Sequence, residues 1–168
     1  MSKKLIIING IMGVGKSTVC RNLYKKLDNC FFLEGDDCWR MNPFTVNDEN
    51  KKMVIENITY MLNSFIKNSS SKYILFNWVI QTDEIMKSIL ERLDLDGVDV
   101  YRITLMCSRE ELEKRIAGDI AKGIRDSGCM ERSMSQYDLY KKMHTIKINT
   151  DNTTIDERSE MIIKLING

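Results

Sequence analysis

Short apolar runs alternate along the chain with longer segments of helical periodicity. Residues 5–8 (Leu-Ile-Ile-Ile) form a continuous apolar run rich in β-branched side chains, and a glycine follows at position 10. This pattern predicts a strand that is buried on both faces. Similar runs predict four more strands, at 30–33, 73–76, within 98–106 and at 145–148.

Helices are expected between these strands. Val54, Ile58, Met61 and Phe65 fall on one face of a helix over 48–67. The other helices are expected at about 16–27, 82–93, 108–120, 133–143 and 154–166. Thr82 can cap one helix, and Ser and Thr followed three residues later by Glu predict capping boxes at Ser108 and Thr154. Strands that alternate with helices predict an α/β fold, a parallel sheet with helices on both faces.

Composition sets limits on organisation and partners. A chain of 168 residues without a linker or repeat predicts one domain over 1–168. The net charge of +1 gives no reason to expect long nucleic acid or an anionic membrane as a partner. The amino-terminal apolar run is too short for a signal peptide, and none of the five cysteines are spaced as CxxC. We expect reduced thiols, a cytoplasmic location, and a monomer or homodimer.

The most specific motif follows the first predicted strand. Residues 10–17 (GIMGVGKS) match G-x-x-x-x-G-K-[ST] at every fixed position, between a strand and a helix. Glycines let successive backbone N–H groups point at phosphate oxygens, lysine adds a full positive charge, and the serine hydroxyl can bind Mg²⁺. Nucleotide contacts are therefore expected at Gly10, Gly13, Val14, Gly15, Lys16, Ser17 and Thr18.

With this phosphate-binding loop and Glu34-Gly35-Asp36-Asp37, the chain resembles the small-molecule and nucleotide kinases of the P-loop group. It looks most like gluconate-kinase-like, shikimate-kinase-like and chloramphenicol-phosphotransferase-like proteins. The resemblance implies a three-layer α/β/α P-loop NTPase fold and a five-stranded parallel sheet of order 2-3-1-4-5. It also implies ATP and Mg²⁺ as cofactors, and a mobile lid at about 122–133.

Two acidic residues follow the second predicted strand. Carboxylates at the carboxyl end of a strand beside the phosphate-binding loop can accept a proton from an acceptor hydroxyl or hold Mg²⁺. On an extended segment, Asp36 and Asp37 should point in opposite directions. The resemblance implies Asp36 as the base and, with Ser17, as a metal ligand. Asp37 is the alternative base or a cap, and Arg40 either binds the acceptor or lies on the solvated surface.

Arginines near the expected lid are candidates for contacts with the nucleotide. The resemblance implies that Arg115 packs on the adenine and that Arg125 closes on the phosphates as a catalytic residue, with Arg132 a third candidate. A pair between Arg115 and Glu111 on one helix surface is the alternative. Residues 149–151 either form an adenine-side loop or a turn before Thr154.

Aromatic and amide side chains near strands two and three are candidates for the acceptor site: Trp39, Phe44, Asn77, Trp78 and Gln81. The tryptophans can stack on a planar acceptor or fill the core. Together these features predict an ATP- and Mg²⁺-dependent kinase that phosphorylates a hydroxyl or phosphate of a small acceptor. Two alternatives stay open: a nucleotide or polynucleotide 5′-end kinase, and a nucleotide-binding switch without a small acceptor.

Overall fold

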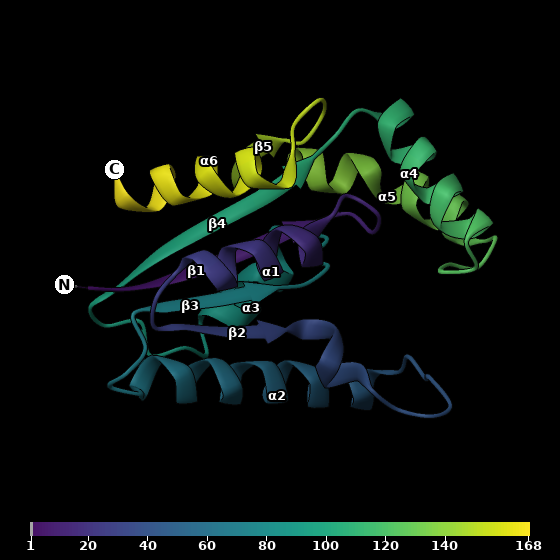
Figure 1. Ribbon diagram of the computed structural model, residues 1–168. Coiled ribbons are helices and arrows are strands. Elements are labelled where there is room, and N and C mark those ends of the chain that lie inside the picture. Colours follow the sequence, from purple (N-terminus) through teal and green to yellow (C-terminus); the bar gives the residue numbers. More distant parts are fainter. Residues whose placement is uncertain (1) are drawn as a thin grey trace.

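One sheet of five parallel strands crosses the molecule in the computed structural model, which describes residues 2–168 (Figure 1). The strands are β1 (Lys3–Gly10), β2 (Cys30–Glu34), β3 (Tyr73–Asn77), β4 (Val98–Met106) and β5 (Ile146–Asn149). Their order is β2-β3-β1-β4-β5, so the predicted topology is confirmed. Because β1 lies at the centre, its residues Leu5 to Ile8 are all fully buried.

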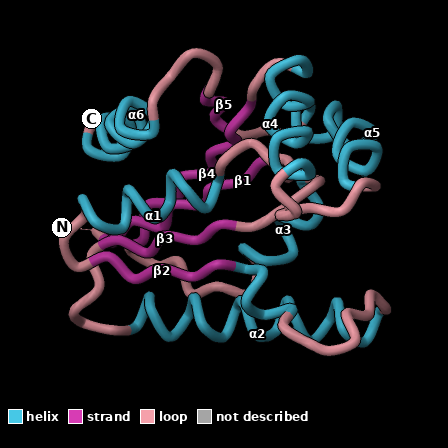
Figure 2. The backbone as a smooth tube through the Cα atoms, turned by 45° about the vertical axis from the view of Figure 1, so that its right-hand side comes forward, coloured by secondary structure: helices cyan, strands magenta, loops and turns pink. Residues whose placement is uncertain are grey.

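Helices cover both faces of the sheet, as Figures 1 and 2 show. They are α1 (Lys16–Lys26), α2 (Asp48–Lys67), α3 (Asp83–Leu90), α4 (Arg109–Ala121), α5 (Cys129–Lys142) and α6 (Ile155–Asn167). Right-handed crossovers place α1 on one face, where α6 packs against it. The same rule places α2, α3 and α5 on the opposite face.

Several predicted boundaries agree with the structure and three do not. The bounds expected for α2 and β4 are confirmed. Helix α3 ends at Leu90 instead of near 93, and α5 begins at Cys129, four residues before the predicted start. The segment after β2 was expected to be extended, but residues Gly35–Trp39 form a 3₁₀ helix, η1. The non-helical part of the segment expected as a lid at about 122–133 therefore ends at Gly128.

The caps were predicted more accurately at one helix than at another. Thr154 and Glu157 form the complete capping box at α6. Ser108 caps α4 through its hydroxyl, but its own N–H donates to Asp151 in the loop after β5. Glu111, which was expected to accept that N–H, instead pairs with Arg115. The tertiary contact between the Ser108 N–H and Asp151 has thus replaced one of the two hydrogen bonds of the predicted capping box.

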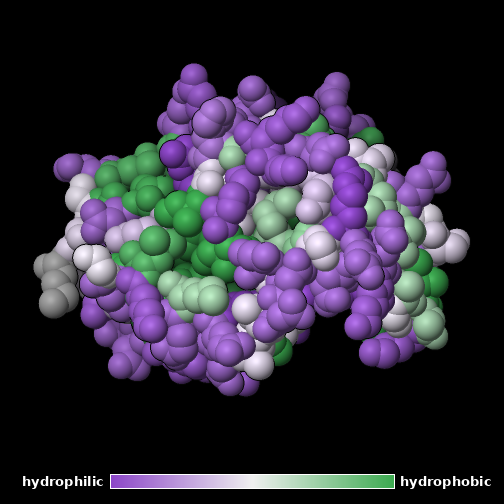
Figure 3. Space-filling model, turned by 90° about the horizontal axis from the view of Figure 1, so that it is seen from above, coloured by the Kyte–Doolittle hydropathy of each residue, from purple (hydrophilic) through white to green (hydrophobic). Residues whose placement is uncertain are grey.

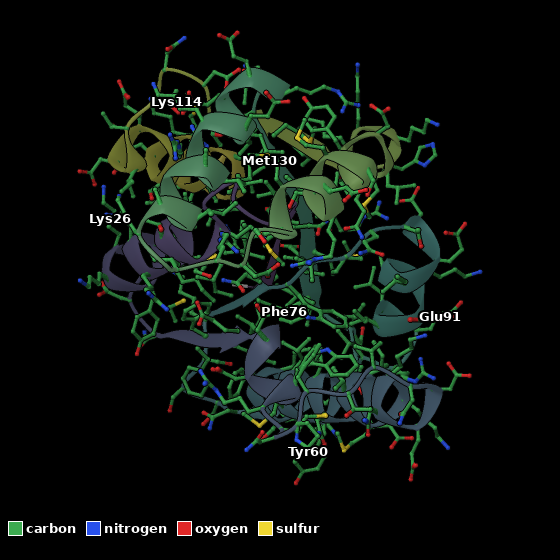
Figure 4. The ribbon with its side chains drawn as sticks, turned by 90° about the vertical axis from the view of Figure 1, so that its right-hand side faces the viewer. Lys26, Tyr60, Phe76, Glu91, Lys114 and Met130 are labelled. Atoms are coloured by element: carbon green, nitrogen blue, oxygen red, sulfur yellow. The ribbon has the colours of Figure 1, made fainter. Side chains whose placement is uncertain are left out.

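The five strands run in the same direction, so their carboxyl ends meet at one edge of the sheet, which Figure 4 faces. Figure 3 shows the face above, where hydrophilic side chains dominate and apolar ones gather toward the end that carries the amino terminus. That apolar area lies away from the carboxyl edge. Within residues 2–168, no helix combines the length and apolar character needed to cross a bilayer.

Candidate active site

The loop between β1 and α1 is shaped by glycines in the left-handed region. Gly13 has φ 89° and Gly15 has φ 100°, values that side-chain-bearing residues rarely adopt. A Cβ on Gly13 would lie 2.8 Å from Cγ1 of Ile116 in α4, so the loop is also packed too closely for a larger residue. Within the described chain, the N–H groups of Gly13 and Gly15 donate to no backbone oxygen.

The amino end of α1 differs from that of four other helices. Asn47, Thr82, Ser108 and Thr154 cap their helices with side-chain oxygens, and acidic residues occupy the first turns of those helices. Gly15 provides no such cap for α1, and the first turn of α1 has no acidic residue. The partial positive charge of the helix amino end is therefore not neutralised by the chain itself. Together with the loop, it forms a surface suited to an anion.

Lys16 lies over this loop. Its ammonium nitrogen Nζ donates to the carbonyl oxygens of Gly10 at 2.7 Å and Ile11 at 3.1 Å. Burial lowers the pKa of the Lys16 ammonium to about 8, the nearby Asp36 carboxylate opposes this shift, and Arg125 adds to it. Asp36 and Arg125, from two other segments of the chain, therefore lie within electrostatic range of the Lys16 ammonium.

The two acidic residues of η1 have different surroundings. The Asp37 carboxylate forms an ion pair with Arg40, with Oδ1 at 2.7 Å from a guanidinium nitrogen. Asp36 forms no ion pair within the described part of the chain, and it lines a cavity together with Met12 of the phosphate-binding loop. Because successive residues of a 3₁₀ helix lie about 120° apart, the two carboxylates still diverge, although the backbone is not extended.

The charge of Asp36 also reaches Tyr140 of α5. Burial, with a contribution from the Asp36 charge, raises the pKa of the Tyr140 phenol of α5 well above its usual range. Tyr140 is fully buried, so α5 supplies a neutral wall near the carboxylate. The Asp36 carboxylate thus lies among Lys16, Tyr140 and the cavity.

The cavity has a volume of about 660 Å³ and adjoins the phosphate-binding loop. Of the acceptor-site candidates from the sequence, it is lined by Trp39, Arg40, Phe44, Trp78 and Gln81. Two other candidates, Asp37 and Asn77, do not line it. Asn77 ends β3 and is only 4% exposed. Both tryptophans of the chain face this one space.

Arg115 is held by several oxygens beside the phosphate-binding loop. Its guanidinium donates to Glu111 at 2.8 Å, to the Val14 carbonyl at 3.2 Å, and to the hydroxyl and carbonyl of Thr150. The helix pair with Glu111 therefore coexists with contacts to the phosphate-binding loop. Residues 149–151 meet Arg115 and Ser108, so this turn is part of the same region.

Arg158 of α6 is a candidate that the sequence analysis missed. Its guanidinium donates to the carbonyls of Thr150 and Thr153, and a nitrogen of the group would lie 3.7 Å from a Cβ on Gly15. Burial and the charge of Arg115 lower the pKa of Arg158. No motif marks this position, because an arginine in the first turns of a terminal helix is ordinary on a solvated surface. Only its proximity to Arg115 and Gly15 in the fold identifies it.

The expected lid residues are tied to acidic neighbours. Arg125 pairs with Asp119 of α4 at 2.8 Å, and Arg132 pairs with Asp126 at 2.6 Å. Arg125 is close enough to Lys16 to affect its ammonium group, whereas Arg132 is not among the charges that do. At the start of α5, the Cys129 thiol lies 3.2 Å from the Met12 sulfur, so this helix touches the phosphate-binding loop.

Ser17 and Asp36 are the residues that could hold Mg²⁺. Within residues 2–168 there is no cluster of three or more His, Cys, Asp or Glu side chains that could hold a metal ion. Mg²⁺ usually keeps several waters and binds one or two protein oxygens together with substrate phosphates. The hydroxyl of Ser17 and one carboxylate fit that requirement, and a site made by protein ligands alone does not exist here.

Comparisons with known proteins agree with this geometry. No curated protein matches the sequence. Three solved structures with similar folds are a tunicamycin resistance protein from Deinococcus radiodurans, a gluconokinase from Sinorhizobium meliloti 1021 and an APS kinase from Mycobacterium tuberculosis. Their TM-scores are 0.69, 0.66 and 0.68, at 15%, 14% and 14% identity. The alignments cover 98%, 98% and 99% of this chain, and 96%, 95% and 99% of theirs.

A family model described as an AAA domain matches residues 6–156, which is most of the chain. The match includes the phosphate-binding loop, the acidic pair and the α4–α5 region. The chain therefore belongs to this AAA domain family and has the P-loop fold of small kinases.

Proposed function

We propose that this protein is an ATP- and Mg²⁺-dependent phosphotransferase that moves the γ-phosphate of ATP to a hydroxyl or phosphate of a small acceptor. One observation carries the proposal: the Asp36 carboxylate acts on the Lys16 ammonium and also lines the adjoining cavity. The Lys16 ammonium, which can stabilise phosphate, and the Asp36 carboxylate, a potential base, thus lie where the phosphate-binding loop and the cavity adjoin. The presence of a gluconokinase and an APS kinase among proteins of similar fold supports this class of reaction.

The nucleotide side is formed by the phosphate-binding loop. The backbone amides of Gly13, Val14 and Gly15 and the amino end of α1 bind phosphate oxygens, and Gly10 allows the turn. Lys16 adds the full charge, and Thr18 contacts the α-phosphate. Ser17 would bind Mg²⁺ directly and Asp36 would hold it through water, which leaves the Asp36 carboxylate able to accept a proton. When bound, MgATP would supply an electrophilic γ-phosphorus, and these groups would offset the negative charge on the phosphate oxygens.

Arg115 and Arg158 orient the base side of the nucleotide. Both guanidinium groups bind the Thr150 carbonyl, so the same turn fixes them in place. A planar guanidinium held by several oxygens can stack on an adenine ring without losing much side-chain entropy. This assignment extends the role inferred for Arg115 to a second arginine.

Asp36 orients the acceptor and takes its proton. The carboxylate lines the cavity and forms no ion pair within residues 2–168, whereas Asp37 is engaged by Arg40. A base must reach the acceptor, so Asp36 is the better candidate of the two. Most of the rate enhancement is expected from positioning and from charge stabilisation by Lys16.

Arg125 approaches the transferring group from the stretch at about 122–133, which acts as a lid. Release from Asp119 lets Arg125 move toward Lys16 and the phosphates, and closure excludes water that would hydrolyse ATP. Residues from Cys129 onward are helical, so we place the moving part mainly in 122–128.

An ADP-release assay over a library of sugars, nucleosides, nucleotides, oligonucleotides and hydroxylated antibiotics tests the proposal. We expect one class to raise MgATP turnover well above background, and Asp36→Asn to remove that increase while MgATP still binds. Turnover that no compound raises, in folded protein that binds MgATP, would instead support the nucleotide-binding switch. Preference for a 5′-hydroxyl of an oligonucleotide would support the 5′-end kinase.

A further inference from the structure

Most of the residues that line the cavity beside Asp36 are apolar. Three aromatic residues line it, Trp39, Phe44 and Trp78, and four aliphatic ones, Met12, Val46, Val79 and Ile85. Phe44 is 67% exposed and Val46 is 57% exposed, so neither is there to fill the core. Exposed apolar side chains gathered around a concave space are typical of a ligand site.

Several polar side chains of the same cavity already have partners, whereas the indole N–H of Trp78 has none within the described residues. Gln81 donates to Gln136 at 3.0 Å, and Arg40 pairs with Asp37. Lys51 has a weaker contact with Asp48, at 3.4 Å. A sugar or sugar acid would bring several hydroxyl groups into this space, and each buried hydroxyl without a partner is costly. Among the lining residues, Asp36 alone combines a charge with the lack of an ion-pair partner.

The aromatic side chains of the cavity are arranged so that the ring of a ligand can pack among them. The centroids of Trp39 and Phe44 lie 5.6 Å apart, with an angle of 49° between the planes. Trp78 lies on the segment after β3 and lines the same space. Aromatic rings prefer tilted or offset contacts at such separations, so a further ring can add to this cluster. A volume of about 660 Å³ is enough for a molecule of one or two rings.

We propose that the acceptor is an uncharged aromatic alcohol: a molecule with an aryl ring that packs among Trp39, Phe44 and Trp78 and a hydroxyl that reaches Asp36. This inference rests on the proposed function and names its substrate class. The hydroxyl oxygen forms a bond to the γ-phosphorus of ATP as the bond from that phosphorus to the β–γ bridging oxygen breaks. ADP leaves, and the hydroxyl proton passes to Asp36 and then to water.

Intrinsic fluorescence offers a direct test, because the only two tryptophans of the chain both line the cavity. The probes are 4-nitrobenzyl alcohol, whose nitroaryl ring quenches tryptophan, 3-phenyl-1-propanol, gluconate and adenosine. Each is titrated in the presence of a non-hydrolysable MgATP analogue, and each is then assayed for ADP release with MgATP. We expect both aryl alcohols to bind, and at least one to be phosphorylated faster than gluconate or adenosine at equal concentration.

Two variants separate the cavity from the fold. Phe44→Ala removes an exposed ring of the cavity, and Tyr60→Ala removes a similarly exposed ring of α2, which does not line it. We expect Phe44→Ala to raise the KM for the aryl alcohol by about tenfold, the effect of one lost aromatic contact, with a smaller change in kcat. Tyr60→Ala should leave both constants unchanged.

Two results would overturn the inference. One is a higher kcat/KM for gluconate or adenosine than for either aryl alcohol. The other is equal effects of Phe44→Ala and Tyr60→Ala. Either result could occur while Lys16→Met still binds MgATP at least about tenfold more weakly than the wild type, and the proposed kinase activity would then stand. Equal MgATP affinities of the wild type and Lys16→Met would instead count against the proposed kinase activity itself.

Discussion

The indole of Trp78 packs directly on the backbone of Gly35. A Cβ on Gly35 would lie 2.5 Å from Cγ of Trp78, closer than any real contact between such atoms. Gly35 is the first residue of η1, and Asp36 follows it. The position of the proposed base is thus coupled to the aromatic wall of the cavity through one glycine.

Substitution of Gly35 tests this coupling. Gly35→Ala should force the indole or η1 to move, lower the free energy of unfolding by about 1–3 kcal/mol, and reduce kcat through displacement of Asp36. Urea unfolding followed by circular dichroism and an ADP-release assay measure the two effects. Gly118→Ala is the matched control, because nothing lies within 4 Å of its Cβ and it is helical. The free energy of unfolding of Gly118→Ala should be about 0.5–1 kcal/mol higher than that of the wild type. A Gly35→Ala protein as stable and active as the wild type would contradict the coupling.

The lowered pKa of Lys16 predicts how nucleotide binding depends on pH. A bound nucleotide phosphate favours the charged form of the Lys16 ammonium, so above pH 8 this group should take up a proton when the nucleotide binds. The affinity for the nucleotide should therefore fall by up to about tenfold per pH unit. Calorimetry of MgADP binding at pH 7 to 9.5, in buffers of different ionisation heat, measures this. Lys16→Arg, whose guanidinium stays charged, should bind with little pH dependence in this window. An affinity of the wild type that is constant to pH 9.5 would contradict the assignment.

The same pKa has a consequence for stability. Because the folded-state pKa is about 8 and the ordinary value is 10.5, the unfolded chain binds more protons between these pH values. The contribution of Lys16 to the free energy of unfolding should therefore rise with pH through this window. Urea midpoints of the wild type and Lys16→Met at pH 7.5 and 9.5 measure it. A difference between the two proteins that does not change with pH would show that the ammonium is not shielded from water.

The two aspartates of η1 should differ in kinetics. Asp36→Asn keeps the shape of the side chain but removes the base, so we expect kcat to fall by about 10²–10⁴. Asp37→Asn weakens an exposed ion pair with Arg40 and should change kcat by less than about threefold. Steady-state kinetics with the best acceptor from the screen measure both. A larger loss in Asp37→Asn would reverse the assignment.

The arginines at the nucleotide side should affect affinity for ATP more than turnover. Arg115→Ala and Arg158→Ala each remove a guanidinium bound to the Thr150 carbonyl, so we expect weaker MgATP binding and a higher KM for ATP. Lys114→Ala is the control on α4, since Figure 4 shows Lys114 on the outside of this helix. Isothermal calorimetry compares the three variants. If Arg158→Ala behaves like Lys114→Ala, Arg158 has no role in binding.

Much of the fold could be predicted because the local signals agree with the tertiary structure. The buried run in β1, the face of α2 and the capping box of Thr154 each reflect a single period or a local hydrogen bond. The start of α5 could not be predicted in this way. Cys129 enters the helix with no side-chain cap and contacts Met12, 117 residues away in sequence. Such a contact leaves no local pattern.

The site was predicted in part for the same reason. The phosphate-binding loop is a contiguous motif, so its residues could be named from the sequence. The cavity is assembled from Met12, η1, the segments after η1 and after β3, and residues of α2 and α3. Its apolar character emerges only when these segments are brought together. Arg158 and the free carboxylate of Asp36 likewise depend on contacts between distant segments.

The most direct test of the whole account is to measure MgATP binding to the wild type and to Lys16→Met by calorimetry. Lys26→Met is the control on the same helix. Lys26 forms surface ion pairs with Asp156 and Glu160, away from the loop. We predict binding to the wild type and to Lys26→Met, competed by ADP, and an affinity at least about tenfold lower in Lys16→Met. Equal affinities in all three folded proteins, or no binding to the wild type, would contradict the account.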